Sequence, residues 1–281
     1  MKKWIIFFVL FFSVSILQAK PNVKQMKAIE GFSVPESVNY DTARNRLYVS
    51  NINGKGTEKN SKGYISIIDT DGKMIEKKWV KGLNAPKGAD ISGDTLYVSD
   101  INRIVAINID SAKIMETYSI PKAKFLNDVA TDKNGNAYIS DSDNSAIYCL
   151  KNGEIKKWFG SDLVNHPNGL YTEDNYLYFS DSKDGWLKKV KIGTKNIEKV
   201  VEIGSGVDGL IKAHGTNFLV SDWKGKTQFV KDTGKKVTLL DTSEENINSA
   251  DIEYIENSHL LFIPTFLDNR VTIYKLDGLT D

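Results

Sequence analysis

The chain has 281 residues, 41% of them hydrophobic, and its 37 basic and 36 acidic side chains leave a formal net charge of +1. This balance excludes a strongly basic face for nucleic acid and a polybasic membrane anchor. The single cysteine, Cys149, excludes an internal disulfide, so burial of apolar strands must stabilise the fold. Because Cys149 lies within a strand-like sequence, we expect a buried structural thiol rather than a reactive one.

The first 19 residues predict a secretory signal peptide. A basic start precedes an apolar run from Trp4 to Leu17, which is short for a membrane span, and Ala19 is a small residue suited to cleavage. No cysteine stands directly after the run, which argues against a lipid anchor. We therefore expect a signal peptide over residues 1–19, one domain over residues 20–281, and a secreted or periplasmic protein without a membrane anchor.

Six similar units follow a lone strand-like segment at residues 23–30. Each unit has a small-residue turn, a short apolar strand, a polar turn and a strand rich in aromatic residues. The aromatic strands end at positions that lie 49, 41, 40, 41 and 43 residues apart, at Asn51, Asp100, Asp141, Asp181, Asp222 and Thr265. Strand units with a period in the forties are typical of a β-propeller. The sequence predicts an all-β, six-bladed propeller with four antiparallel strands in each blade.

The last unit, from residue 248 to about residue 277, contains only three predicted strands. The segment at residues 23–30 matches the outer strands of other units, such as residues 74–79 and 154–158, but no unit precedes it. We therefore predict that residues 23–30 pair with residues 271–276 and complete the last blade. Such closure removes the exposed strand edges that an open ring would leave.

A polar residue stands near the start of each predicted inner strand. The six residues of this column are Glu36, Lys87, Asn127, Asn168, Asp208 and Asn248. Because the inner strands of a propeller line its central channel, we expect these side chains to converge on the mouth of the channel.

Two carboxylates and three amide oxygens form a hard, all-oxygen environment, which suits Ca²⁺, Mg²⁺ or Mn²⁺. A cation there would polarise an ester or lactone carbonyl and lower the pKa of a bound water, while a carboxylate took the proton. Two alternatives stay open. Small polar residues are also favoured in turns that enter a strand, and the Lys87 ammonium would replace the cation if it paired with Glu36 or Asp208.

Four short motifs in these units resemble the regucalcin/gluconolactonase family of six-bladed propellers, which are relatives of the paraoxonases. The motifs are Pro-Glu-Ser-Val at residues 35–38, Leu-Asn-Asp-Val at 126–129, Pro-Asn-Gly-Leu at 167–170 and Val-Asp-Gly-Leu at 207–210. The resemblance implies one divalent cation held by Glu36, Asn168 and Asp208, with Asn127 close by. Ca²⁺ is the first expectation, and Mg²⁺, Mn²⁺ and Zn²⁺ are alternatives.

Three residues depart from the pattern of this family. Phe125 stands where the sugar-lactone enzymes of this family commonly carry an arginine, and Tyr40 replaces the usual tryptophan. Lys87, a lysine among the six polar residues, is the third departure. The resemblance is therefore closer for the cation site than for the sugar site. We expect Asn127, Phe125 and Lys87 to contact the substrate, and Phe125 suits an apolar lactone or ester better than a sugar lactone.

The leading hypothesis is an exported metal-dependent hydrolase of lactones or related esters, in which Asp208 or His166 handles the proton. A solvated turn is the alternative interpretation of His166. The chain has no Gly-x-Ser-x-Gly motif, so a serine-hydrolase triad is not expected. The second hypothesis is a non-catalytic propeller that binds a small ligand or a protein partner, with Lys87 neutralising the ring.

Overall fold

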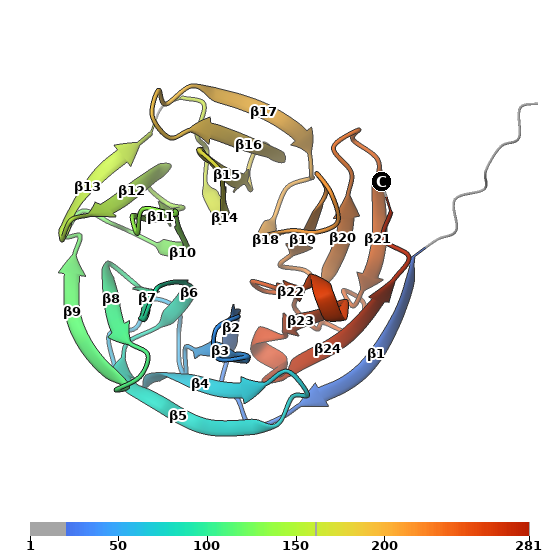
Figure 1. Cartoon of the computed structure of the whole chain (residues 1–281), viewed down its shortest axis with the longest axis horizontal. Helices are drawn as coiled ribbons and strands as arrows, with labels where there is room; N and C mark the ends of the chain where they lie inside the picture. Colours follow the sequence, from blue (N-terminus) through green and yellow to red (C-terminus); the bar gives the residue numbers. More distant parts are fainter. Residues whose placement is uncertain (1–20, 161, 281) are drawn as a thin grey trace, which may run out of the picture.

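Six four-stranded antiparallel sheets surround a central channel in the computed structural model (Figure 1). The structure describes residues 21–160 and 162–280, so the predicted signal peptide lies outside the described residues. The predicted six-bladed propeller with four strands in each blade is confirmed.

In the first three blades the strands run outward from the channel in chain order. Their bounds are β2 (Pro35–Asp41), β3 (Arg46–Asn51), β4 (Gly63–Asp69), β5 (Met74–Leu83), β6 (Pro86–Ser92), β7 (Thr95–Asp100), β8 (Arg103–Asn108), β9 (Lys113–Ser119), β10 (Leu126–Thr131), β11 (Ala137–Asp141), β12 (Ala146–Lys151) and β13 (Glu154–Phe159).

Blades four and five repeat this order, and the last blade differs at its outer edge. The remaining strands are β14 (Pro167–Glu173), β15 (Tyr176–Asp181), β16 (Trp186–Lys191), β17 (Ile197–Glu202), β18 (Val207–Lys212), β19 (Phe218–Asp222), β20 (Lys226–Val230), β21 (Lys236–Asp241), β22 (Glu253–Ile255), β23 (Leu260–Pro264), β24 (Val271–Asp277) and β1 (Asn22–Ile29). Two short 3-10 helices, η1 (Glu256–Ser258) and η2 (Phe266–Asp268), flank β23.

The N-terminal strand closes the ring. The last blade has the order β1-β24-β23-β22, and β1 pairs antiparallel with β24 from Asn22 opposite Asp277 to Ile29 opposite Val271. Figure 1 shows the first strand, in blue, lying along the last one, in red. The predicted pairing is confirmed, and it covers the edge that β24 would otherwise expose.

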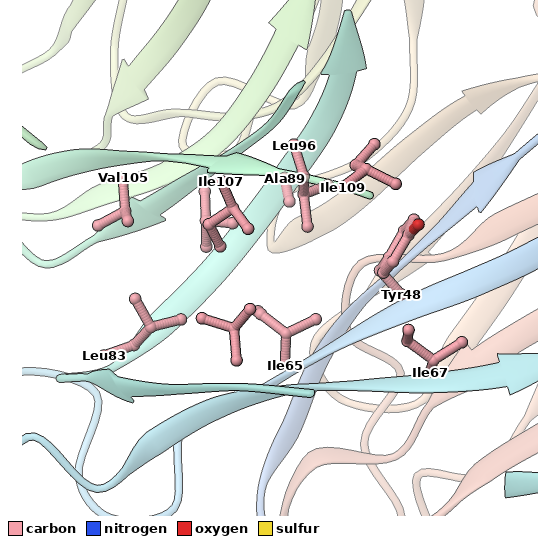
Figure 2. Packing of buried hydrophobic residues seen from close by; sticks show 11 residues of the cluster. Tyr48, Ile65, Ile67, Leu83, Ala89, Leu96, Val105, Ile107 and Ile109 are labelled. Carbon is pink, nitrogen blue, oxygen red and sulfur yellow. The ribbon is translucent and has the colours of Figure 1, made fainter. Parts of the chain in front are cut away.

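Apolar side chains fill the space between neighbouring blades. Figure 2 shows Tyr48, Ile65 and Ile67 of the first blade facing Leu96 and Ile107 of the second, and all five belong to one buried cluster. Full burial of a side chain such as Leu96 is favourable by about 1.5–3 kcal/mol. Each blade thus depends on its neighbours, which explains why the alternating apolar pattern recurs in every unit.

Cys149 lies in β12 with 8% of its surface exposed. Burial raises the pKa of its thiol to about 11, which disfavours the reactive thiolate. The expectation of a buried thiol is confirmed. In the part of the chain that the structure describes, no helix has the length and apolar character needed to cross a membrane.

Candidate functional site

A bulge at the start of each of the first five inner strands aims one side chain at the channel. The pairing of β2 with β3 shifts register between Pro35 and Ser37, and that of β14 with β15 shifts between Pro167 and Leu170. The same shift occurs in β6, β10 and β18. A bulge removes residues from the ladder and redirects their side chains. The first residues inside these bulges are Glu36, Lys87, Asn127, Asn168 and Asp208.

These five side chains line one cavity of about 270 Å³ at the mouth of the channel. Phe125 and His166 line it too, so the structure brings all seven site residues predicted from the sequence together. The other lining residues are Ile52, Gly56, Ser182, Gly206, Val207, Trp223 and Phe266.

The prediction that Asn248 is the sixth member of the ring was wrong. In the fourth blade, Asn168 lies three residues before Tyr171, which pairs with Tyr178. In the last blade, the equivalent pair is Glu253 and Phe262, so the position equivalent to Asn168 is three residues before Glu253. Ala250 therefore occupies the sixth position. Because side chains alternate with a period of two, a slip of two residues keeps the in-and-out pattern and is invisible in the sequence.

The side chain of Asn248 lies elsewhere and donates to the Trp223 carbonyl at 2.8 Å. The ring at the channel mouth thus has five polar members and one alanine.

Asp208 and Asn168 form the centre of the polar part of the cavity. The Asn168 amide nitrogen donates to Asp208 Oδ1 at 2.8 Å, which leaves the amide oxygen as the group to face a cation. Asp208 is 6% exposed, and burial raises the pKa of its carboxyl to about 6, opposed by this hydrogen bond. The carboxyl of Asp208 is therefore poised to exchange a proton near neutral pH.

Glu36 carries an unsatisfied oxygen. Only 4% of the residue is exposed, and Glu36 Oε2 has no hydrogen-bond partner among the described residues. Burial raises the pKa of Glu36 well above its usual value, and the nearby charge of Asp208 adds to the increase, whereas Lys87 opposes it. A buried carboxylate oxygen without a partner is costly, and a bound cation would relieve that cost.

The donor set fits a hard divalent cation, because it offers two carboxylates and amide oxygens around one cavity. Within residues 21–160 and 162–280 no three His, Cys, Asp or Glu side chains form a metal-binding group. A cation here would therefore depend on amide oxygens and water to complete its shell.

Lys87 points along the cavity wall. Its ammonium lies 4.4 Å from the centre of the Phe125 ring and 3.5 Å from the carbonyl oxygen of Ala85. Burial lowers the pKa of Lys87, and the charges of Glu36 and Asp100 oppose the decrease. Among the ion pairs of the described residues, none joins Lys87 to Glu36 or Asp208. The ammonium is thus near the candidate cation position without a direct carboxylate contact.

Lys87→Met is expected to tighten Ca²⁺ binding by about tenfold at pH 8, because it removes a positive charge from a poorly solvated site. Calorimetric titration of the wild type and the variant measures the change. Lys231→Met, which alters a buried lysine outside the cavity, is the matched control. Unchanged or weaker binding in Lys87→Met would show that the ammonium does not oppose the cation.

His166 enters the cavity from the turn before β14. Its φ of 66° is in the left-handed region, and its Nδ1 lies 3.8 Å from Asp143 Oδ1. The Ser182 hydroxyl donates to the His166 carbonyl at 3.0 Å and fixes the turn. About 30% of the imidazole side chain is exposed, so it has access to both solvent and the cavity.

The sequence interpretation missed Ile52, Trp223 and Phe266, although a signal for them was present. Each follows the last residue of an aromatic strand, and the same position holds Ile101, Ser142 and Ser182 in the other units. The position directly after each aromatic strand therefore indicates further residues at the channel mouth. The missed Gly56 belongs to the loop after β3, whose extra length explains the first spacing of 49.

A second hollow lies deeper along the inner strands. It has a volume of about 290 Å³, and we call its four acidic residues, Asp90, Asp128, Asp251 and Glu253, the acidic chamber. Burial raises the pKa of Asp128 to about 8 and that of Glu253 to about 7. Burial also raises the pKa of Asp90 and, together with neighbouring carboxylates, that of Asp251.

Comparison with solved structures supports the fold. The chain is similar to virginiamycin B lyase from Staphylococcus aureus, solved with quinupristin in a catalytically inactive form, at a TM-score of 0.64 and 13% identity, covering 91% of this chain and 99% of that one. A gluconolactonase from Xanthomonas campestris gives a TM-score of 0.64 at 13% identity, covering 88% of each chain.

A chain of a nidogen/laminin complex gives a TM-score of 0.60 at 16% identity, covering 73% of this chain and 79% of that one. No protein-family model and no curated protein matches the sequence. The resemblance to the gluconolactonase propellers is thereby confirmed at the level of the fold.

Proposed function

We propose that this protein is an exported hydrolase of lactones or related esters that uses one divalent cation at the channel mouth. The observation that carries the proposal is the cavity itself, in which five bulged inner-strand residues meet and Glu36 has a buried oxygen without a partner. The fold shared with a gluconolactonase supports the same reaction class.

In this proposal Glu36, Asn168 and Asp208 hold the cation, with Ca²⁺ as the first expectation and Mg²⁺, Mn²⁺ or Zn²⁺ as alternatives; the all-oxygen donor set suits Zn²⁺ least. When bound, the cation supplies Lewis-acid polarisation of the carbonyl and acidifies water.

The remaining steps belong to side chains of the cavity. The Asp208 carboxylate accepts a proton from the attacking water. Asn127 orients the water or the substrate, and Lys87 favours the negative charge that develops on the carbonyl oxygen. His166 is the second candidate for the proton transfer, from the rim of the same cavity.

Chelation is expected to abolish turnover of lactones and aryl esters, and added Ca²⁺ is expected to restore it. The measurement combines calorimetry of the EDTA-treated protein with Ca²⁺, Mn²⁺ and Zn²⁺ and a panel of lactones and aryl esters. Absence of binding to every cation would refute the proposal. Cation binding with inactivity across the panel would favour the alternative, a non-catalytic propeller for a small ligand or a protein partner.

A further inference from the structure

Apolar side chains form part of the lining of the cavity at the channel mouth. The column that follows the aromatic strands places Ile52, Trp223 and Phe266 in blades one, five and six, which are neighbours in the ring, and Ser182 in blade four. We call Ile52, Val207, Trp223 and Phe266 the apolar wall of the cavity. The polar residues Glu36, Asn168 and Asp208 line the same cavity.

Trp223 and Phe266 pack against each other across two blades. Their ring centres are 4.3 Å apart, and the planes meet at 71°, an edge-to-face contact. Trp223 is 38% exposed, which is high for a tryptophan that already has an aromatic partner. Both rings line the cavity, and Phe266 also packs against the buried cluster of Ile52, Ala85 and Ile101.

The backbone at Phe266 is held in an unfavourable conformation. Its φ of 49° is in the left-handed region, which is rare for an aromatic residue. The turn is fixed by hydrogen bonds from Asn269 N to the Phe266 carbonyl and from Val34 N to Asn269 Oδ1. Strain of this kind persists at sites where a side chain must keep one position.

Phe125 adds a third aromatic ring to the cavity, with the Lys87 ammonium 4.4 Å from its centre. A sugar lactone presents a hydroxyl on nearly every carbon, and the apolar wall offers those hydroxyls only one polar side-chain group, the indole N–H of Trp223. Burying hydroxyl groups without partners is unfavourable, whereas burying an alkyl or aryl group is favourable.

We infer that the substrate carries a hydrophobic substituent, a long alkyl chain or an aryl ring, which lies against Trp223 and Phe266 while its ester group faces Asp208. The inference rests on the proposed function and names its substrate class. Trp223 and Phe266 are then specificity-determining residues, contributed by the loops after β19 and β23.

The test compares δ-decalactone, which has an alkyl chain, with unsubstituted δ-valerolactone and with glucono-δ-lactone. The wild type is expected to prefer δ-decalactone. Trp223→Ala and Phe266→Gly are expected to lower the ratio of kcat/KM for δ-decalactone to kcat/KM for δ-valerolactone by about tenfold or more. Glycine accepts the left-handed φ at position 266, so that variant is expected to fold. Trp186→Ala, in β16 outside the cavity, is the matched control.

A binding measurement that needs no catalysis separates the inference about the substrate from the proposed hydrolase function. The lactam analogue of δ-decalactone, titrated by calorimetry, is expected to bind the wild type and to bind Trp223→Ala about tenfold more weakly. Lactam binding that depends on Trp223 in a protein without hydrolytic activity would support the apolar subsite and refute the proposed function. Preference for glucono-δ-lactone, or equal losses on all three lactones in Trp223→Ala, would overturn the inference while the proposed function stood. Failure to bind the lactam would overturn the inference in either case.

Discussion

Asp208→Ala is expected to lower kcat/KM for lactone hydrolysis by about 10³-fold and to abolish stabilisation of the protein by Ca²⁺. The carboxylate has two proposed roles, as an oxygen ligand and as the proton acceptor, and a positioned general base alone contributes about 10²–10⁴-fold. Asp208 also accepts the hydrogen bond from Asn168, so its loss frees that amide. Initial rates with saturating Ca²⁺, together with thermal melts with and without Ca²⁺, measure both effects.

Asp132→Ala is the matched control for this variant. Asp132 is also buried and accepts hydrogen bonds from Asn134, Asn136 and Tyr138, but it lies at a turn of the third blade outside the cavity. The control is expected to lose stability and to keep its activity per folded molecule. If Asp208→Ala keeps full Ca²⁺ binding and activity, the assignment of the site is wrong.

The second large effect is expected in the pH dependence of stability. Without a divalent cation, the melting temperature is expected to fall by about 5–10 °C between pH 5 and pH 8.5. Carboxyl groups of the acidic chamber have raised pKa values in the folded state, among them Asp128 at about 8 and Glu253 at about 7. Asp208, at about 6, adds to them from the cavity.

The sign follows from proton linkage. A carboxyl whose folded-state pKa is raised binds its proton more tightly in the folded state than in the unfolded one. Its contribution to stability is therefore fully present below the unfolded-state value, near 4, and is lost as the pH rises through 6 to 8. Lys87 acts in the opposite sense because its pKa is lowered, but it is one group against several.

Thermal melts in EDTA at pH 5, 6, 7 and 8.5 measure this dependence. The double variant Asp128→Asn, Glu253→Gln is expected to flatten the curve, because the amides do not titrate. Its melting temperature is expected to be lower at every pH, because each amide can keep the hydrogen bond from the Leu170 or Tyr40 amide but loses the one from the Val129 or Tyr254 amide. A melting temperature that rises with pH in the wild type would contradict the predicted protonation of the chamber.

Much of the site could be predicted from the sequence because the six repeated units can be aligned with one another. A bulge occurs at the same place in five units, so one column of residues predicted Glu36, Lys87, Asn127, Asn168 and Asp208 around one opening. The same method failed at Asn248, where the strand entry of the sixth unit has a different sequence and a two-residue slip preserved the pattern.

The apolar wall shows that comparing equivalent positions in the six units does not predict every residue of the site. Ile101 and Trp223 occupy equivalent positions after their strands, yet only Trp223 lines the cavity. Ile101 is 6% exposed and lies in a buried cluster with Ala85 and Ile52, and of these three residues only Ile52 also lines the cavity. The sequence supplies the same position in both blades, but the path of each loop decides whether its side chain faces the cavity or the neighbouring blade.

The sequence by itself determined the blades, the closure of the ring by residues 23–30 and the five polar residues at the mouth, because these depend on local alternation repeated six times. Only the tertiary structure decided which charges are buried together. Asp128 and Asp251 are far apart in the chain, and the pKa of Asp251 rises partly because Asp128 is its neighbour across the channel. Such electrostatic coupling exists only after the ring has closed and excluded water, since desolvation and distance are properties of the assembled fold.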